Sequence, residues 1–144
     1  MKKGLLIIGI ILVGVFGLIQ LVPYGHDHTN PPVVSTPSWD SAQTQAIAEK
    51  ACYDCHSNQT VWPWYSNVAP VSWLVLRDVQ EGRLNLNFSD WSNYQLMASD
   101  AAAVVQSGKM PPAQYLIIHS DARLTDAEKQ QLIQGLQTLA AQSQ

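Results

Sequence analysis

The chain has 144 residues, enough for about one domain, and 47 % of them are hydrophobic. Its net charge is −3, and residues 23–144 alone carry −5 because Lys2 and Lys3 lie before them. This acidic net charge excludes nucleic-acid binding as the function of the protein. The chain also lacks the large basic patch that binds anionic lipid. Any attachment to a membrane must therefore come from an apolar segment.

An apolar run covers residues 4–22, with Gln20 as its only polar side chain. Its length suits a helix that crosses a bilayer core of about 30 Å. It is either an uncleaved anchor or a cleaved signal peptide, and its length and the lack of an A-x-A-like cleavage site after it favour the anchor. Lys2 and Lys3 would stay in the cytoplasm, so the rest of the chain would face outward.

Residues 23–38 hold four prolines and show no apolar periodicity, which predicts an extended linker. His26 and His28 lie in this stretch. We expect both histidines to be solvated. The alternative is that one of them ligates a haem iron or packs on the following domain, residues 39–144.

Cys52 and Cys55 are the only cysteines, and His56 follows them directly in the pattern CxxCH. This pattern is typical of covalent attachment of c-type haem, in which both thiols bind the vinyl groups and the histidine ligates the iron. A redox dithiol or half of a zinc site is the alternative. A dithiol of the thioredoxin kind expects a βαβ setting, which this chain lacks, so haem attachment is favoured.

Four helices are expected after the linker. The first begins at Ser38 or Asp40 and runs into CxxCH. The second runs from Pro70 to a stop at Gly82, and the third extends from near Ser89 to Gly108. The third carries an apolar stripe in which Met97 is assigned to the core.

The last helix begins at a capping box, Thr125-Asp126-Ala127-Glu128. Gly135 weakens this helix unless another helix crosses closely there. No convincing strand pattern is present, so the sequence predicts an all-α fold.

Met110 lies in the segment Lys109-Met110-Pro111-Pro112, where two prolines restrict the backbone. A thioether is a soft ligand for haem iron, and methionine opposite histidine raises the reduction potential. Met110 is therefore the expected sixth ligand, with His119 and then His28 as alternatives. The remaining candidates for the haem pocket are Trp62, Trp64, Tyr65, Arg83 and Tyr115. The arginine is either a solvated charge or a partner of a haem propionate.

The order of these elements resembles class I cytochromes c, and the chain is more closely similar to a small haem-binding domain family of bacterial envelope cytochromes. The resemblance rests on CxxCH, on the Met-Pro loop and on the tryptophan-rich segment. It covers residues 28–32, 51–75, 81–91, 107–119 and 122–132. It implies a cytochrome c-like helical domain around one covalent haem c, ligated by His56 and Met110.

The expected function is electron transfer by a membrane-anchored monohaem cytochrome rather than enzymatic catalysis. A haem-based gas sensor or a peroxidase with a labile sixth ligand is the alternative. We expect a single-pass protein of the bacterial inner membrane, with its domain in the periplasm. Its partners would be redox proteins, such as a respiratory or photosynthetic complex, with a basic docking face.

Overall fold

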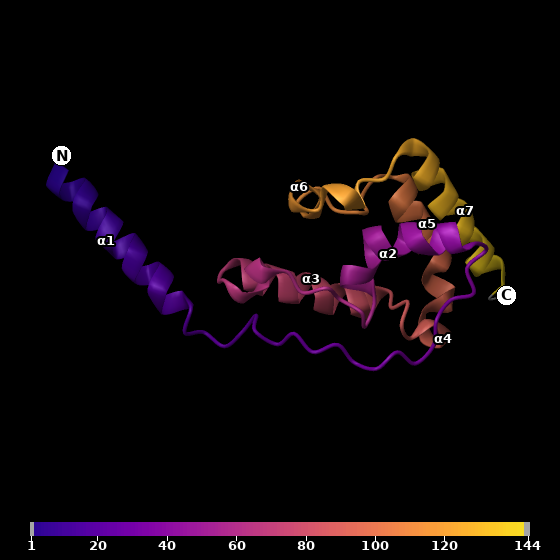
Figure 1. Cartoon of the computed structure of the whole chain (residues 1–144), viewed down its shortest axis with the longest axis horizontal. Coiled ribbons are helices and arrows are strands. Elements are labelled where there is room, and N and C mark those ends of the chain that lie inside the picture. The colour runs from indigo at the N-terminus through magenta and orange to yellow at the C-terminus, as the bar shows by residue number, and fades with distance from the viewer. Residues whose placement is uncertain (1, 143–144) are drawn as a thin grey trace. The chain divides into compact units, whose positions relative to one another are not determined.

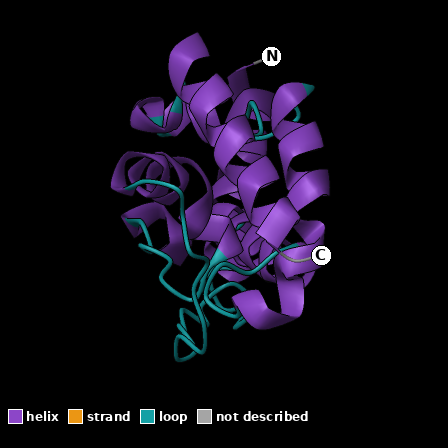
Figure 2. Ribbon diagram, turned by 90° about the vertical axis from the view of Figure 1, so that its right-hand side faces the viewer, coloured by secondary structure: helices purple, strands orange, loops and turns teal. Residues whose placement is uncertain are grey.

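A computed structural model describes residues 2–142, which form helices and connecting loops and no strand (Figure 2). The longer helices are α1 (Lys2–Ile19), α2 (Ala42–His56), α3 (Val71–Asn85), α5 (Ala98–Gln106) and α7 (Asp126–Gln142). The short ones are α4 (Trp91–Tyr94) and α6 (Tyr115–Ile118), with 3-10 turns η1 (Trp64–Asn67), η2 (Gln95–Met97) and η3 (Ser120–Ala122). The predicted all-helical class is confirmed.

The chain divides into two compact units. The first unit comprises the residues up to Thr29 together with Trp62–Asp78, and the second comprises Asn30–Val61 and the residues from Val79 onward. In the first unit, α1 is long and apolar enough to cross a membrane, and none of it is buried; among residues 2–142 it is the one helix of this kind. Residues 23–38 contain no helix.

The core of the second unit lies between α2, α5 and α7, and Figure 1 shows α5 beside α7 with α2 crossing them. Thirteen buried side chains form it: Ile47, Ala48, Tyr53, Leu86, Phe88, Trp91, Ala98, Ala102, Val105, Leu132, Ile133, Leu136 and Leu139. Four of them, Leu132, Ile133, Leu136 and Leu139, come from α7. The core therefore holds one face of α2 fixed while its C-terminal end carries CxxCH.

Two predicted helix boundaries are wrong. Ser41 caps α2, because its Oγ accepts a hydrogen bond from the Thr44 N–H at 3.1 Å, so neither Ser38 nor Asp40 starts the helix. Gly82 does not end α3, which continues to Asn85. This glycine instead lies at a close contact between α3 and Cys55 of α2.

The third expected helix is broken into α4, η2 and α5. The 3-10 turn η2 shifts the 3.6-residue period. Met97 is consequently 40 % exposed rather than part of the core.

Gly135 of α7 lies where α2 crosses. A Cβ atom at this position would collide with Cγ2 of Thr44, so a larger residue would force the helices or the buried Thr44 side chain to shift. The condition under which Gly135 would not weaken the helix, a close crossing by another helix, is therefore met.

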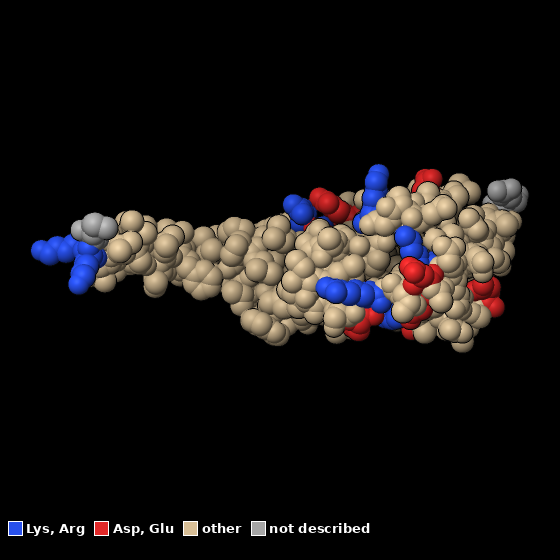
Figure 3. All heavy atoms as spheres, turned by 90° about the horizontal axis from the view of Figure 1, so that it is seen from above, with Lys and Arg blue, Asp and Glu red and all other residues tan. Residues whose placement is uncertain are grey.

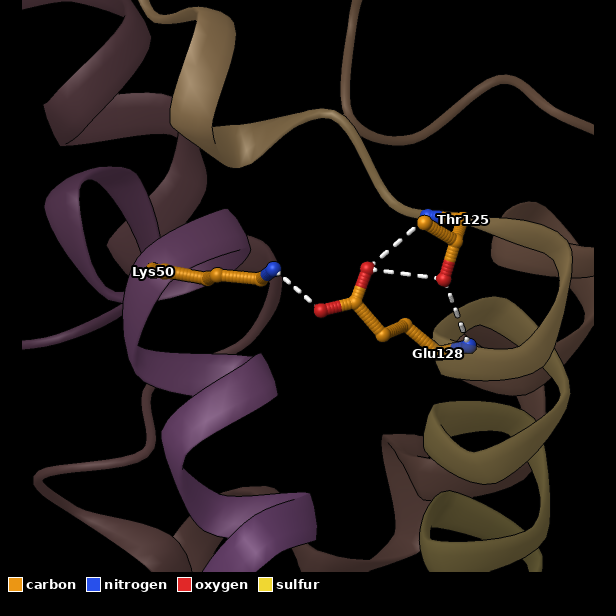
Figure 4. Close-up of polar contacts among 3 residues, drawn as sticks. All are labelled: Lys50, Thr125 and Glu128. Carbon is orange, nitrogen blue, oxygen red and sulfur yellow. Dashed lines mark hydrogen bonds and ion pairs between the residues drawn. The ribbon is translucent and has the colours of Figure 1, made fainter.

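The predicted capping box is present and also joins two helices (Figure 4). The Thr125 N–H donates to Glu128 Oε2 at 2.9 Å, and the Glu128 N–H donates to Thr125 Oγ1 at 3.2 Å. Lys50 of α2 donates to the other carboxylate oxygen of Glu128. The cap of α7 is thus tied to the helix that carries CxxCH.

Glu128 makes stability depend on pH. The hydrogen bond from Lys50, followed by those from Thr125, lowers the pKa of Glu128 from 4.5 to about 2. A carboxylate with a depressed folded-state pKa stabilises the fold fully above its unfolded pKa, and this contribution is lost as the pH falls towards 2. We expect the urea midpoint to fall more steeply between pH 5 and pH 2 in the wild type than in Glu128→Gln.

Lys50→Gln should give an intermediate slope, because it removes the first of these hydrogen bonds and leaves the cap. Denaturation curves across this pH range measure the effect. Identical slopes for the wild type and Glu128→Gln would contradict the assignment.

Candidate functional site

Cys52 and Cys55 lie on successive turns of α2, with half-buried side chains, and their thiols form no disulfide. Residues three apart on a helix share a face, so both sulphurs project from the same side of α2. Burial, followed by the charge of Cys55, raises the pKa of Cys52 to about 12. The thiol of Cys52 is therefore protonated at neutral pH before any bond is made to it.

His56 is the last residue of α2, and its ring is held in one orientation. Nδ1 lies 3.1 Å from the carbonyl oxygen of Leu86 and must be the donor, because a carbonyl only accepts. Burial lowers the pKa of His56, although the nearby carbonyls of Leu86 and Gly82 act in the opposite direction. The imidazole is thus neutral, with its lone pair on Nε2, which is the form that binds a metal.

Gly82 explains how the Leu86 carbonyl reaches His56. A Cβ atom on Gly82 would collide with the carbonyl oxygen of Cys55 and would lie 2.9 Å from its carbonyl carbon. Helices α3 and α2 therefore touch backbone to backbone at this point, and the chain leaves α3 beside the histidine. The sequence analysis treated Gly82 as a helix stop and missed this contact.

A buried polar network fixes the segment that follows α3. The Phe88 N–H donates to the carbonyl of His56 at 2.8 Å. Asn87 Nδ2 donates to Asn58 Oδ1 at 2.9 Å, and the Asn58 N–H donates to Ser89 Oγ at 3.0 Å. All three polar side chains, Asn58, Asn87 and Ser89, are buried. Sequence reasoning missed them, and their only signal was a run of small polar residues with no period.

Asp54, between the two cysteines, ties two other segments to α2. Its Oδ2 accepts a hydrogen bond from the Tyr115 hydroxyl at 2.8 Å, and its Oδ1 accepts one from the Val61 N–H at 3.0 Å. Burial, followed by the hydrogen bond to Asp54, raises the pKa of Tyr115 above its usual range. The Tyr115 ring also stacks on His119, with ring centroids 4.1 Å apart.

Met110 lies in the loop between α5 and α6, and its side chain is 38 % exposed. Its N–H donates to the Val104 carbonyl at 3.3 Å, which holds the start of the loop on the end of α5. Gly108 allows the chain to reverse there, with a φ of +72°. The loop is therefore held at α5 on one side and, through Tyr115 and Asp54, at α2 on the other.

Arg83 braces the turn after His56. Its Nε donates to the Ser57 carbonyl at 2.8 Å, and its Nη2 donates to Asn30 Oδ1 at 2.8 Å and to Thr60 Oγ1 at 3.0 Å. Arg83 is therefore not a solvated charge. Its pairing with a propionate stays a prediction.

The aromatic candidates Trp62, Trp64 and Tyr65 belong to the first unit. The Trp62 ring stacks on His28 at 4.4 Å, and His28 Nε2 donates to the Ser66 carbonyl at 3.1 Å. The expectation that His28 is solvated is wrong, because stacking on Trp62 and the hydrogen bond to Ser66 hold its ring. Trp64 is 80 % exposed and meets Tyr65 edge-on.

The residues at the end of α2 fit a covalently held haem. Two thiols that form no disulfide project from one face of the helix, one turn apart, and the next residue offers a neutral imidazole with Nε2 available. These are the groups needed for two thioether bonds and one axial nitrogen. In residues 2–142, no group of three or more His, Cys, Asp and Glu side chains is arranged to hold a metal ion.

Comparison with known families agrees with this geometry. The family model described as a haem-binding domain matches residues 14–138. Since the match covers most of the sequence, the chain belongs to this haem-binding domain family, and haem is its cofactor. No curated protein and no solved structure matches the chain.

The buried network next to His56 should contribute measurably to stability. Asn87→Ala leaves Asn58 Oδ1 and the Ser89 N–H without their partner, which we expect to destabilise the fold by about 1–3 kcal/mol. Asn85→Ala is the control, because the Asn85 side chain is exposed and donates only to the Glu81 carbonyl within α3. We expect this variant to change the free energy of unfolding by about 0.5 kcal/mol or less. Urea unfolding followed by circular dichroism measures both. Equal effects would show that the network carries no special stability.

Proposed function

We propose that this haem protein is a membrane-tethered monohaem c-type cytochrome that carries electrons and is not an enzyme. Cys52 and Cys55 would hold the haem through thioether bonds, and His56 and Met110 would be its axial ligands. The bound group would supply a one-electron ferric/ferrous couple. The observation that carries the proposal is the end of α2, where two thiols that form no disulfide precede an imidazole whose Nδ1 is held by Leu86.

The chain's own residues prepare this chemistry. The Leu86 carbonyl selects the tautomer and orientation of His56, and the buried network keeps Leu86 in place. Such outer hydrogen bonds raise the basicity of a histidine ligand and fix its ring. Rigid ligands suit electron transfer, because little has to move when the charge changes.

Met110 is proposed as the second axial ligand because of its chemistry and its loop. The segment after it is held to α2 by the hydrogen bond from Tyr115 to Asp54, so the methionine belongs to a loop connected to the attachment helix. A thioether ligand would raise the reduction potential. His119 and His28 are the alternative ligands.

A gas sensor or a peroxidase is the second candidate function. It is favoured by the exposure of Met110 on a loop, from which a ligand can be displaced by a small molecule. A peroxidase also needs a distal acid–base residue, and His119, stacked on Tyr115, would be the candidate.

The proposed location is the bacterial inner membrane, with the second unit in the periplasm. Helix α1 has 18 residues, which extend over about 27 Å, close to the thickness of a bilayer core. Figure 3 shows basic side chains at the start of this helix and uncharged surface along the rest of it. A cleaved signal sequence also has a basic start followed by an uncharged apolar helix. The proposed partners are redox proteins of a respiratory or photosynthetic complex, and a basic docking face would complement the acidic domain.

Covalent attachment is tested on the full-length protein, produced in a host that matures c-type cytochromes. We expect the haem to stay with the polypeptide in acid–acetone, because thioether bonds survive this treatment. Cys52→Ala and Cys55→Ala should each lose one of the two bonds, and the double variant should lose all covalent haem. Complete extraction of haem from the wild type would overturn the c-type assignment while leaving haem binding intact.

The sixth ligand is tested by comparing Met110→Ala with Met97→Ala, a control of similar exposure on η2. We expect only Met110→Ala to lose the weak red-edge ferric band of sulphur ligation and to lower the potential by about 0.1 V or more, since axial ligands set haem potentials over about 0.8 V. A wild type without this band, or an unchanged potential in Met110→Ala, would shift the assignment to His119 or His28. Rapid CO uptake by the reduced wild type would favour the sensor.

A further inference from the structure

The first unit is almost free of charge. Residues 4–26 and 62–76 contain no Asp, Glu, Lys or Arg, and they make up most of this unit. The surface of a small soluble domain ordinarily carries about 25–35 % charged residues. The absence of charge therefore extends beyond α1 to a second segment, which is rich in aromatic residues and distant in sequence.

Gln20 joins the end of α1 to this second segment. Its side-chain Nε2 donates to the Ala69 carbonyl at 3.0 Å, and the Ala69 N–H donates to Gln20 Oε1 at 2.9 Å. One side-chain amide thus satisfies both backbone groups of a buried residue, while Nε2 also lies 3.0 Å from the Phe16 carbonyl. The only polar residue of the apolar run is therefore used to fix residue 69 at the point where α1 ends.

Two further contacts continue this attachment. Gly25 is buried with a φ of +94°, and a Cβ atom there would lie 2.8 Å from both Ser72 Oγ and Trp73 Cδ1. His28 stacks on Trp62 and donates to Ser66. Residues 20–28 therefore pack along residues 62–73, so that the aromatic segment is fixed to the end of the proposed anchor.

Several large side chains of this unit remain exposed. Trp64 is 80 % exposed, Leu21 78 %, Leu74 50 % and Tyr24 47 %. Tryptophan and tyrosine are enriched where a protein meets the interface between lipid and water, because their rings are apolar with one polar group. Large apolar side chains left exposed in a unit that is almost without charge make this unit a candidate for an interaction site.

We propose that residues 62–76 lie in the headgroup layer of the bilayer that α1 crosses, with Trp64 and Leu74 in contact with lipid and Gln20 as the positioning residue. This inference rests on the anchoring part of the proposed function. Lipid fits better than a protein partner because the segment is attached where the apolar run ends, and because it offers no charge to a polar partner.

The test uses the full-length holoprotein in vesicles of phosphatidylethanolamine and phosphatidylglycerol. Benzoylphenylalanine, a photoreactive residue, replaces Trp64 or Leu74, and lipid adducts are measured by mass spectrometry after illumination. Leu84 and Leu96, which are 75 % and 67 % exposed in the second unit, are the control positions. We expect several-fold more lipid adduct at Trp64 and Leu74 than at the controls.

Gln20→Leu tests the positioning role, because it keeps the run apolar and removes both hydrogen bonds to Ala69. We expect lipid adducts at residue 64 to fall several-fold, while adducts from the same photoreactive residue placed at Phe16, within α1, stay unchanged. A merely stabilising role for Gln20 would leave the adducts at residue 64 as they are, and that result would overturn the positioning role.

The remaining outcomes separate this inference from the proposed function. Adducts at Phe16 without adducts at residues 64 and 74 would overturn the interfacial placement alone. Adducts at residue 64 to protein rather than lipid would overturn it in favour of a protein partner. An intact mass that lacks α1 would overturn the anchor and this inference together, and acid-stable haem would still support the cytochrome.

Discussion

The hydrogen bond from His56 Nδ1 to the Leu86 carbonyl is the constraint on which the site depends. It leaves Nε2 as the basic nitrogen and holds the ring in one plane. The bond exists only because Gly82 lets α3 touch the backbone of α2 at Cys55, which brings the end of α3 to the histidine. The buried side chains of Asn58, Asn87 and Ser89 then keep the following segment from moving away.

Helix α2 serves the core and the site at once. Its buried residues, such as Ile47 and Ala48, pack among α5 and α7, and Gly135 admits α2 to close contact with α7. The ion pair between Lys50 and Glu128 adds a connection to the α7 cap. A site carried by such a packed helix is held more rigidly than one on a loop, which suits a group that has to keep its ligands in place.

In the first unit, the residues that follow the N-terminal helix pack against a segment distant in sequence. Gln20, Gly25 and His28 each contact the segment between Trp62 and Trp73, so the residues after α1 are not a free tether. Residues 30–35 are likewise held in the second unit, where the Val34 N–H donates to the Ser89 carbonyl. The proline-rich stretch lacks helix, as its composition indicates, but contacts fix its path.

Features that depend on near neighbours could be predicted from the sequence. CxxCH, the capping box at Thr125 and the apolar run at residues 4–22 are each complete within a few turns of chain, and the helical class follows from apolar periodicity. The folded chain was needed to show the role of Gly82, the stacking of His28 on Trp62, the pairing of Gln20 with Ala69 and the network around Asn87. These contacts join residues far apart in the chain, and no local period or propensity encodes which distant backbone a glycine or an amide will meet.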